Sequence, residues 1–302
     1  MHGMEITWLT QASFAFDCKG KRVVVDPYLS NIATANHGMT RIAEFPLSMD
    51  ELKPDFIFCT HDHVDHLDPE GLPQIAEAYP DCLFIGPQSV VAHYRKLGIE
   101  PNRIQELIAG ESRSLGPFTL TATQAVHSDY YAVGLIVQTL ENCVYLSGDT
   151  LSFKTLGEHV KQLAQTELDI VLICINGRLG NMTLDEAVNV VGELRPRLAI
   201  PMHYGLFAEN TVDPQPFVEK CKALGVAAQT LTPGASLRLN PRPGEVESKI
   251  KHEGSKDTKL RNTIRHFLVF LTSFSACRLC NCLLPSELMK FTNRRFKRAV
   301  HS

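Results

Sequence analysis

The sequence predicts an α/β protein in which two β-sheets pack face to face and helices cover their outer sides. Two patterns predict it: short strands joined by turns open the chain, and strands alternating with helices follow in two successive portions. A length of 302 residues, 44% of them hydrophobic, is enough to bury a large core. We therefore predict a globular domain over residues 1–240 and a separate tail over residues 241–302.

The opening elements follow from apolar runs that are broken by turn residues. Strands are predicted at Glu5–Leu9, Ser13–Cys18 and Arg22–Asp26, with Lys19-Gly20-Lys21 as a hairpin connection. Residues 27–48 show little periodicity. A loop of that length inside a compact domain is typically a functional rim or lid, so we expect this segment near a binding site.

The remaining elements alternate between apolar strands and helices. Gly98 and Gly225 stand just past two of the predicted helices and mark their ends. Further strands are predicted at 56–59, Leu83–Gly86, Phe118–Gln124, Gly134–Thr139, Val144–Ser147, Asp169–Ile175, Leu198–Pro201, Ala228–Leu231 and Ser236–Leu239, and helices at Pro69–Ala78, Ser89–Leu97, Phe153–Ala164, Leu184–Leu194 and Pro214–Leu224.

Charge and cysteine usage narrow the class of protein. Residues 1–240 hold 17 basic and 28 acidic residues, a net charge of −11, whereas residues 241–302 hold 13 and 5, a net charge of +8. An acidic body offers no basic surface, which disfavours nucleic acid as a partner. The body's cysteines are scattered through apolar runs, a pattern typical of reduced thiols in a cytoplasmic protein. No signal peptide or integral membrane segment is expected, and a homo-oligomer is compatible with the sequence.

The tail has a composition of its own. It is apolar at Phe267–Phe274 and then becomes basic, and the apolar run is too short to span a bilayer. Cys277, Cys280 and Cys282 lack the second pair that a closed zinc site needs. A peripheral membrane or partner segment is one reading of the tail. We favour a poorly ordered, basic, cysteine-containing appendage, because the body already supplies the elements of a complete domain.

The segment His61-Asp62-His63-Val64-Asp65-His66 concentrates metal-binding side chains directly after an apolar strand. Imidazole and carboxylate groups are good ligands for zinc, manganese or iron. Alternate residues of an extended segment point the same way, so His61 and His63 can hold one ion together. Asp65 and His66 follow the turn and can face a second ion. A lone His-x-His pair is weakly specific, but three histidines and an aspartate in this order favour a metal site.

Three more candidate ligands follow other predicted strands. His127 comes after Phe118–Gln124, Asp149 after Val144–Ser147 and a glycine, and His203 after Leu198–Pro201. Each polar residue leaves an apolar strand on the side of the sheet where loops gather. Together with the first cluster they form a candidate set of seven ligands.

This ordered set resembles the five motifs of the metallo-β-lactamase superfamily over residues 4 to about 240. The resemblance implies a four-layer αββα sandwich, a metallo-β-lactamase-like hydrolase domain, with two divalent metal ions at the sheet edge. By the same resemblance, one ion is held by His61, His63 and His127, the other by Asp65, His66 and His203, and Asp149 bridges them. Zinc is the leading metal, with manganese or iron as alternatives that the same ligands suit.

Within the superfamily, the chain is most similar to the L-ascorbate-6-phosphate lactonase group. The likeness lies in Thr60-His61-Asp62-His63, Ser147-Gly148-Asp149-Thr150, Ile200-Pro201-Met202-His203-Tyr204 and, less specifically, residues 175–183. It departs from that lactonase in lacking a long N-terminal extension before the first strand. The resemblance implies a lactone, such as a sugar-acid phosphate lactone, as the substrate.

Two such ions can share a water molecule and lower its pKa, which predicts hydrolysis by a metal-activated bridging water. Asp65, Asp149 and His203 are the predicted catalytic residues. Asn176, Arg178 and Tyr204 are the predicted contacts to a small-molecule substrate, although the asparagine can equally shape its turn and Arg178 can pair with a surface acid. The full histidine set favours hydrolysis over oxygen reduction at di-iron, where the family resemblance implies a glutamate in place of one histidine. A phosphodiesterase or nuclease of the same fold, and a non-catalytic metal-binding regulatory protein, are the alternatives.

Overall fold

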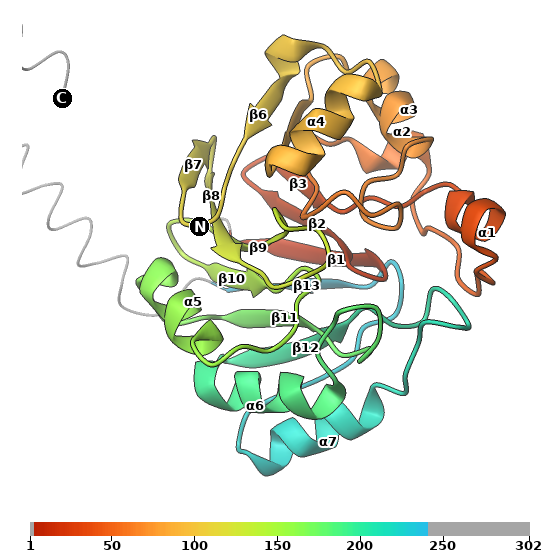
Figure 1. Ribbon diagram of the computed structural model, residues 1–302. Helices are drawn as coiled ribbons and strands as arrows, with labels where there is room; N and C mark the ends of the chain where they lie inside the picture. The colour runs from red at the N-terminus through yellow and green to blue at the C-terminus, as the bar shows by residue number, and fades with distance from the viewer. Residues whose placement is uncertain (1–2, 241–302) are drawn as a thin grey trace, which may run out of the picture. The chain divides into compact units, whose positions relative to one another are not determined.

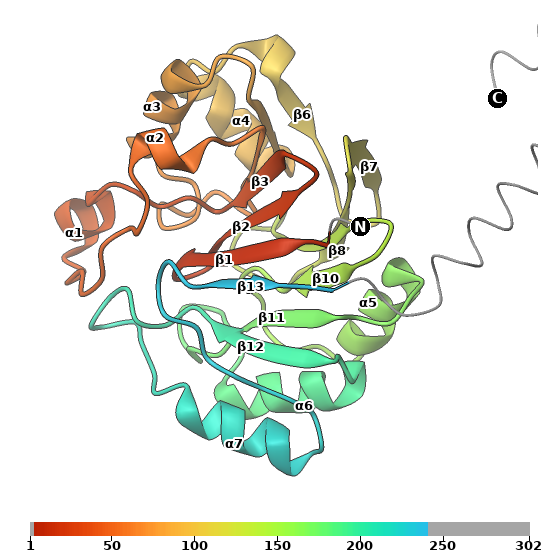
Figure 2. The same ribbon diagram turned by 180° about the vertical axis from the view of Figure 1, so that it is seen from behind.

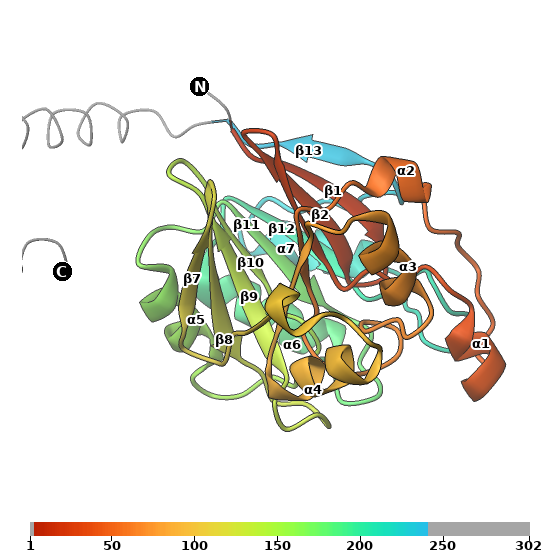
Figure 3. The ribbon, with the colours of Figure 1, turned by 90° about the horizontal axis from the view of Figure 1, so that it is seen from above.

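The computed structural model describes residues 3–240, so the predicted tail lies outside the described residues. Two β-sheets, one of seven strands and one of six, pack against each other, and helices lie on their outer sides (Figure 1). The two sheets form separate layers when the molecule is seen from above (Figure 3). The predicted fold class is therefore confirmed.

The seven-stranded sheet has the strand order β13-β1-β2-β3-β4-β5-β6. Strands β13, β1, β2 and β3 pair antiparallel, and β3, β4, β5 and β6 pair parallel. The bounds are β1 Glu5–Thr10, β2 Ser13–Cys18, β3 Lys21–Val25, β4 Phe56–Phe58, β5 Leu83–Gly86, β6 Ile104–Glu106 and β13 Ser236–Arg238.

The six-stranded sheet has the strand order β12-β11-β10-β9-β8-β7. Strands β10, β11 and β12 are parallel, and β7 to β10 are antiparallel. Strands β8, β10, β11 and β12 therefore run in one direction and end at the same edge. The bounds are β7 Ser112–Leu115, β8 Phe118–Gln124, β9 Val133–Gln138, β10 Cys143–Leu146, β11 Ile170–Cys174 and β12 Leu198–Met202.

Helices cover the outer side of each sheet (Figures 1 and 2). Helix α4 packs on β5 and β6, whereas α5, α6 and α7 pack on β8, β11 and β12. None of the helices in residues 3–240 has the length and apolar character needed to cross a bilayer. The bounds are α1 Ile32–His37, α2 Met49–Leu52, α3 Gly71–Ala78, α4 Gln88–Lys96, the 3₁₀ turn η1 Pro101–Arg103, α5 Leu156–Ala164, α6 Leu184–Leu194 and α7 Gln215–Ala223.

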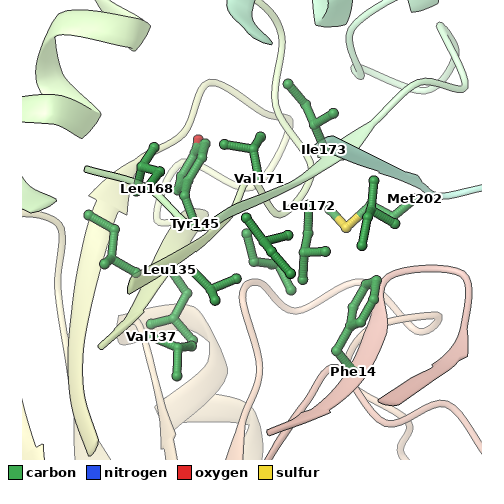
Figure 4. Close-up of a cluster of buried hydrophobic side chains, with 14 of the residues drawn as sticks. Phe14, Leu135, Val137, Tyr145, Leu168, Val171, Leu172, Ile173 and Met202 are labelled. Carbon is green, nitrogen blue, oxygen red and sulfur yellow. The ribbon is translucent and has the colours of Figure 1, made fainter. Parts of the chain in front are cut away.

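Strand periodicity divides the side chains between two cores. Along β2, Phe14 and Phe16 enter the core between the sheets, and Ala15 between them faces the helix side. Phe14 points toward Leu172 and Met202 of the opposite sheet (Figure 4). Apolar burial on both faces of the first sheet holds it rigidly between the helices and the second sheet.

Several details differ from the sequence prediction, and one is the short helix α2, which was not predicted. Helix α1 lies inside the segment 27–48 that was expected to be a loop. Strands β6 and β7 were missed because their sequences, IQE and SRSL, are short and mostly polar. The expected strand Ala228–Leu231 is reduced to an isolated bridge between Ala228 and Ala199. Sheet edges need few apolar residues, so local pattern is weakest there.

Candidate metal centre

All seven predicted ligands lie at one edge of the two sheets. Strands β4, β8, β10 and β12 each end just before one part of the set. The ligands are His61, His63, Asp65 and His66 after β4, His127 after β8, Asp149 after β10, and His203 after β12.

The side chains form three overlapping groups that could each hold a cation. Within each group the ligand atoms lie within 4.8 Å of one another. One group matches the predicted first ion and another the predicted second ion, while Asp149 joins His61 and His66 in the group between them. The groups are His61/His63/His127, Asp65/His66/His203 and His61/His66/Asp149.

In the first group, ring nitrogens face each other across a short gap. His127 Nε2 lies 3.2 Å from His63 Nδ1. The other nitrogen of His63, Nε2, lies 3.1 Å from Ser128 Oγ. His63 therefore presents Nδ1, rather than Nε2, to the centre.

In the second group, His66 Nε2 and His203 Nε2 lie 3.3 Å apart, and Asp65 Oδ2 is 3.8 Å from each. Asp149 reaches both halves of the centre. Its Oδ2 is 3.0 Å from His203 Nε2 and 3.9 Å from His127 Nε2, and its Oδ1 is 3.4 Å from His66 Nε2. This is the position that a bridging carboxylate requires.

A buried aspartate behind the centre fixes two of the histidines. Asp26 is fully buried, and its Oδ2 accepts hydrogen bonds from His66 Nδ1 at 2.8 Å and from Thr60 Oγ1 at 2.7 Å. Because the Thr60 hydroxyl donates its hydrogen bond to Asp26, its Oγ1 can accept a hydrogen bond from His61 Nδ1, which lies 3.0 Å away. His61 and His66 thus carry protons on Nδ1 and turn Nε2 lone pairs inward.

Three further contacts hold the other ligands. His127 Nδ1 donates to the Gly180 carbonyl at 3.1 Å, which leaves its Nε2 as the inward lone pair. Asn181 Nδ2 donates to Asp149 Oδ2 at 2.7 Å. Gln11 Nε2 donates to Asp65 Oδ2 at 3.0 Å and lies 3.4 Å from His203 Nε2.

The unpaired atoms fit a bound cation. Within the described residues, His61 Nε2 and Asp149 Oδ1 are buried and have no hydrogen-bond partner. Leaving such atoms unpaired is costly, and a cation in their midst would remove the cost. The donor set of imidazoles and carboxylates suits zinc, manganese and iron.

The electrostatics favour positive charge at the centre. Burial opposes protonation of His66, yet the carboxylates of Asp149, Asp65 and Asp26 raise its pKa well above the ordinary value. Burial lowers the pKa of His61 well below the ordinary value, which keeps that imidazole neutral as a ligand must be. A negative field that draws a proton onto His66 also draws a divalent cation.

Comparison with known proteins identifies the family. The profile described as the Beta-lactamase superfamily domain matches residues 21–204. The chain belongs to the β-lactamase superfamily. It is 30% identical over 254 residues to a UPF0173 metal-dependent hydrolase of Methanopyrus kandleri, a match that covers 77% of this chain and 99% of that protein. The resemblance to a superfamily of metal-dependent hydrolases is confirmed, whereas the narrower likeness to the lactonase group stays a prediction.

Solved structures of other metalloproteins share the fold. Igni18, a metallo hydrolase from Ignicoccus hospitalis, superposes with a TM-score of 0.66 at 21% identity, covering 79% of this chain and 99% of that one. CmlA, a di-iron β-hydroxylase from Streptomyces venezuelae, gives 0.63 at 19% identity, covering 79% of this chain and 54% of that one. One fold thus carries hydrolysis and oxidation, so the ligand set and its surroundings must indicate the reaction.

The three predicted substrate contacts of this superfamily member differ in their surroundings. Asn176 is buried and donates to the Arg178 carbonyl and to Asn210 Oδ1, so it shapes the loop. Arg178 is exposed and donates from Nη1 to the Glu209 carbonyl. Tyr204 packs its ring 5.1 Å from that of Trp8, and burial raises its pKa to about 12. Contact of any of the three with substrate stays a prediction.

Sequence reasoning missed the residues that hold the ligands. Asp26 directly follows β3, and Thr60 lies between β4 and the histidine cluster. A polar residue just after an apolar strand is therefore the sequence signal that could have identified each of them. Asn181 lies in the Gly/Asn-rich loop that follows β11. Gln11 lies in a turn of ordinary composition and left no such signal.

Proposed function

We propose that the centre binds two divalent metal ions and hydrolyses lactones. The ion predicted for His61, His63 and His127 and the one predicted for Asp65, His66 and His203 would share Asp149. The observation that carries the proposal is the inward set of lone pairs, in which His61 Nε2 is buried and has no hydrogen-bond partner among the described residues. Zinc is the leading metal, with manganese or iron as alternatives. A cytoplasmic location remains part of the proposal.

Bound cations would lower the pKa of a water molecule and stabilise negative charge on a substrate oxygen. The chain's own residues orient the reactants. Asp149 contacts His66, His127 and His203, so it is the carboxylate placed to orient the attacking water and take its proton. Asp65 and His203 are the other two predicted catalytic residues, and both stand beside Asp149: His203 Nε2 lies 3.0 Å from Asp149 Oδ2 and 3.8 Å from Asp65 Oδ2.

Three observations support hydrolysis of a lactone. Family relatives carry the name metal-dependent hydrolase. The predicted ligand set keeps all five of its histidines, whereas the oxygen-reducing branch is expected to replace one histidine with glutamate; the five are His61, His63, His66, His127 and His203. The motifs around the ligands resemble the lactonase group, for which a sugar-acid phosphate lactone is one candidate substrate. The exposed guanidinium of Arg178 would contact its anionic end.

The test is a joint assay of metal content and turnover on the purified full chain. We expect about two ions per chain after loading with zinc, manganese or iron in separate preparations. We expect turnover of lactones in preference to phosphodiesters and β-lactams. Fewer than one ion per chain would overturn the two-metal centre, and turnover of phosphodiesters alone would replace the lactone assignment.

A further inference from the structure

A buried glutamine projects its side chain into the second ligand group, Asp65/His66/His203. Gln11 lies in the turn between β1 and β2 and is 1% exposed. Its carbonyl accepts hydrogen bonds from Trp8 Nε1 at 3.1 Å and from the His203 backbone amide at 3.0 Å. Gln11 and His203 have left-handed φ values of +50° and +63°, which non-glycine residues hold only where their surroundings fix them. The backbone therefore holds the Gln11 side chain against this half of the centre.

The end of the Gln11 side chain stands at the spacing of a ligand. Gln11 Nε2 lies 3.0 Å from Asp65 Oδ2 and 3.4 Å from His203 Nε2. Within the ligand group itself, His66 Nε2 and His203 Nε2 lie 3.3 Å apart. Atoms that share one ion through bonds of about 2.0–2.2 Å are about 2.8–3.6 Å apart in octahedral or tetrahedral geometry. The amide end of Gln11 therefore fits into the same ligand shell as these residues.

The side-chain oxygen of Gln11 is the atom suited to a cation. Oε1 is buried and has no hydrogen-bond partner among residues 3–240, which is costly. The amide NH₂ group only donates, whereas the amide oxygen carries two lone pairs. A half-turn about the Cγ–Cδ bond exchanges the two atoms without moving the backbone. Oε1 would then face Asp65 Oδ2, acceptor against acceptor, an arrangement that a cation between them makes favourable.

We propose that Gln11 is a further ligand of the second metal ion, which it binds through Oε1 after this half-turn. The inference rests on the metal centre of the proposed function and adds a metal preference to one half of it. Asp65, Asp149 and Gln11 would give the second ion three oxygen ligands beside two imidazoles, whereas the first ion has three imidazoles and Asp149. Carboxylate and carbonyl oxygens suit manganese, and a shell of four ligands rich in imidazole suits zinc. Gln11 thus favours manganese at the second position.

The test compares two substitutions of Gln11 in the purified full chain after its metals have been removed with a chelator. Gln11→Leu removes the oxygen, and Gln11→Glu keeps an oxygen but removes the N–H donors. Gln162→Leu makes the first change at an exposed position of α5. Manganese binding is measured by loss of the EPR signal of the free ion, and zinc binding by competition with a chromophoric chelator. Circular dichroism in EDTA controls for folding.

The ligand assignment predicts a different response for each metal. One manganese-binding step should weaken at least about tenfold in Gln11→Leu, the loss that follows even from removing a group that supports a ligand. Zinc binding should weaken by less than about threefold in the same variant, because four ligands remain and complete a tetrahedral site. Gln11→Glu and Gln162→Leu should bind manganese as tightly as the parent or more tightly.

The outcomes separate this assignment from the proposed hydrolysis. Manganese binding that Gln11→Leu leaves unchanged would overturn the assignment while lactone hydrolysis stands. Equal losses of manganese and zinc in both Gln11 variants would also overturn it, because Gln11 would then act only by orienting Asp65 through its N–H group. Weaker manganese binding in Gln11→Leu alone, in a chain that hydrolyses no lactone, would support the ligand and overturn the lactone assignment.

Discussion

Replacing Asp26 with asparagine tests how the protein directs its histidines toward a cation. Asp26 Oδ2 accepts hydrogen bonds from both His66 Nδ1 and Thr60 Oγ1, and its Oδ1 accepts one from the Thr60 backbone amide. Asparagine keeps one acceptor oxygen and turns the other position into a donor. If the remaining oxygen stays on the Thr60 amide, the new NH₂ group meets His66 Nδ1–H, donor against donor. His66 then moves its proton to Nε2 and loses the lone pair that faces the centre.

The expected magnitude follows from the role of such supporting groups. Loss of a partner that orients a ligating histidine weakens metal binding by about 10–100-fold, or about 1.4–2.7 kcal/mol. The fold should survive the change. Burial is the largest influence on Asp26 and raises its pKa, despite the neighbouring His66 and Thr60. The buried charge is therefore not a net source of stability in the metal-free chain.

The assay is a competition titration of zinc and manganese against a chromophoric chelator, with thermal unfolding in EDTA as the folding control. Asp81→Asn makes the same substitution at an exposed position away from the centre. We expect weaker metal binding in Asp26→Asn alone, and a melting temperature in EDTA within a few degrees of the parent. Metal affinity within about threefold of the parent would refute the tautomer argument, because the expected loss is at least about tenfold.

Three further predictions use simpler measurements. His63→Ala should abolish hydrolysis while circular dichroism stays native, whereas the exposed His37→Ala should keep activity; unchanged turnover in His63→Ala would count against the site. Gly148→Ala should lower the free energy of unfolding in urea by about 1–3 kcal/mol, because φ is +58° and a Cβ would lie 2.7 Å from the Val133 carbonyl; an unchanged midpoint would contradict this. Burial raises the pKa of the Cys82 thiol to about 12 and of Cys174 to about 11. Unfolded thiols ionise near about pH 8.5, so above that pH the folded state holds more protons than the unfolded state. The free energy of unfolding in EDTA should therefore fall between about pH 8.5 and 11, and both thiols should resist alkylation until the protein unfolds. A flat pH profile or rapid labelling of the native protein would be inconsistent with their burial.

Local pattern was sufficient for most of the layered fold because most of the strands carry either an apolar alternation or a continuous apolar run. Phe14, Ala15 and Phe16 show this directly, since their sides of the sheet follow from a period of two. The same pattern failed at the edge strands β6 and β7, which are short and mostly polar. It also missed α1, whose six residues bury only Ala33 and so leave no apolar stripe.

The sequence by itself determined the types and order of the candidate ligands, because side chains at strand ends are marked by the apolar runs before them. Only the tertiary structure decided which atom of each residue faces the centre. His66 is oriented by its hydrogen bond to Asp26, which lies 40 residues earlier in the sequence, and Gln11 contacts His203, which lies 192 residues later. Contacts between distant segments follow from how the two sheets and their helices pack, and no local periodicity encodes them.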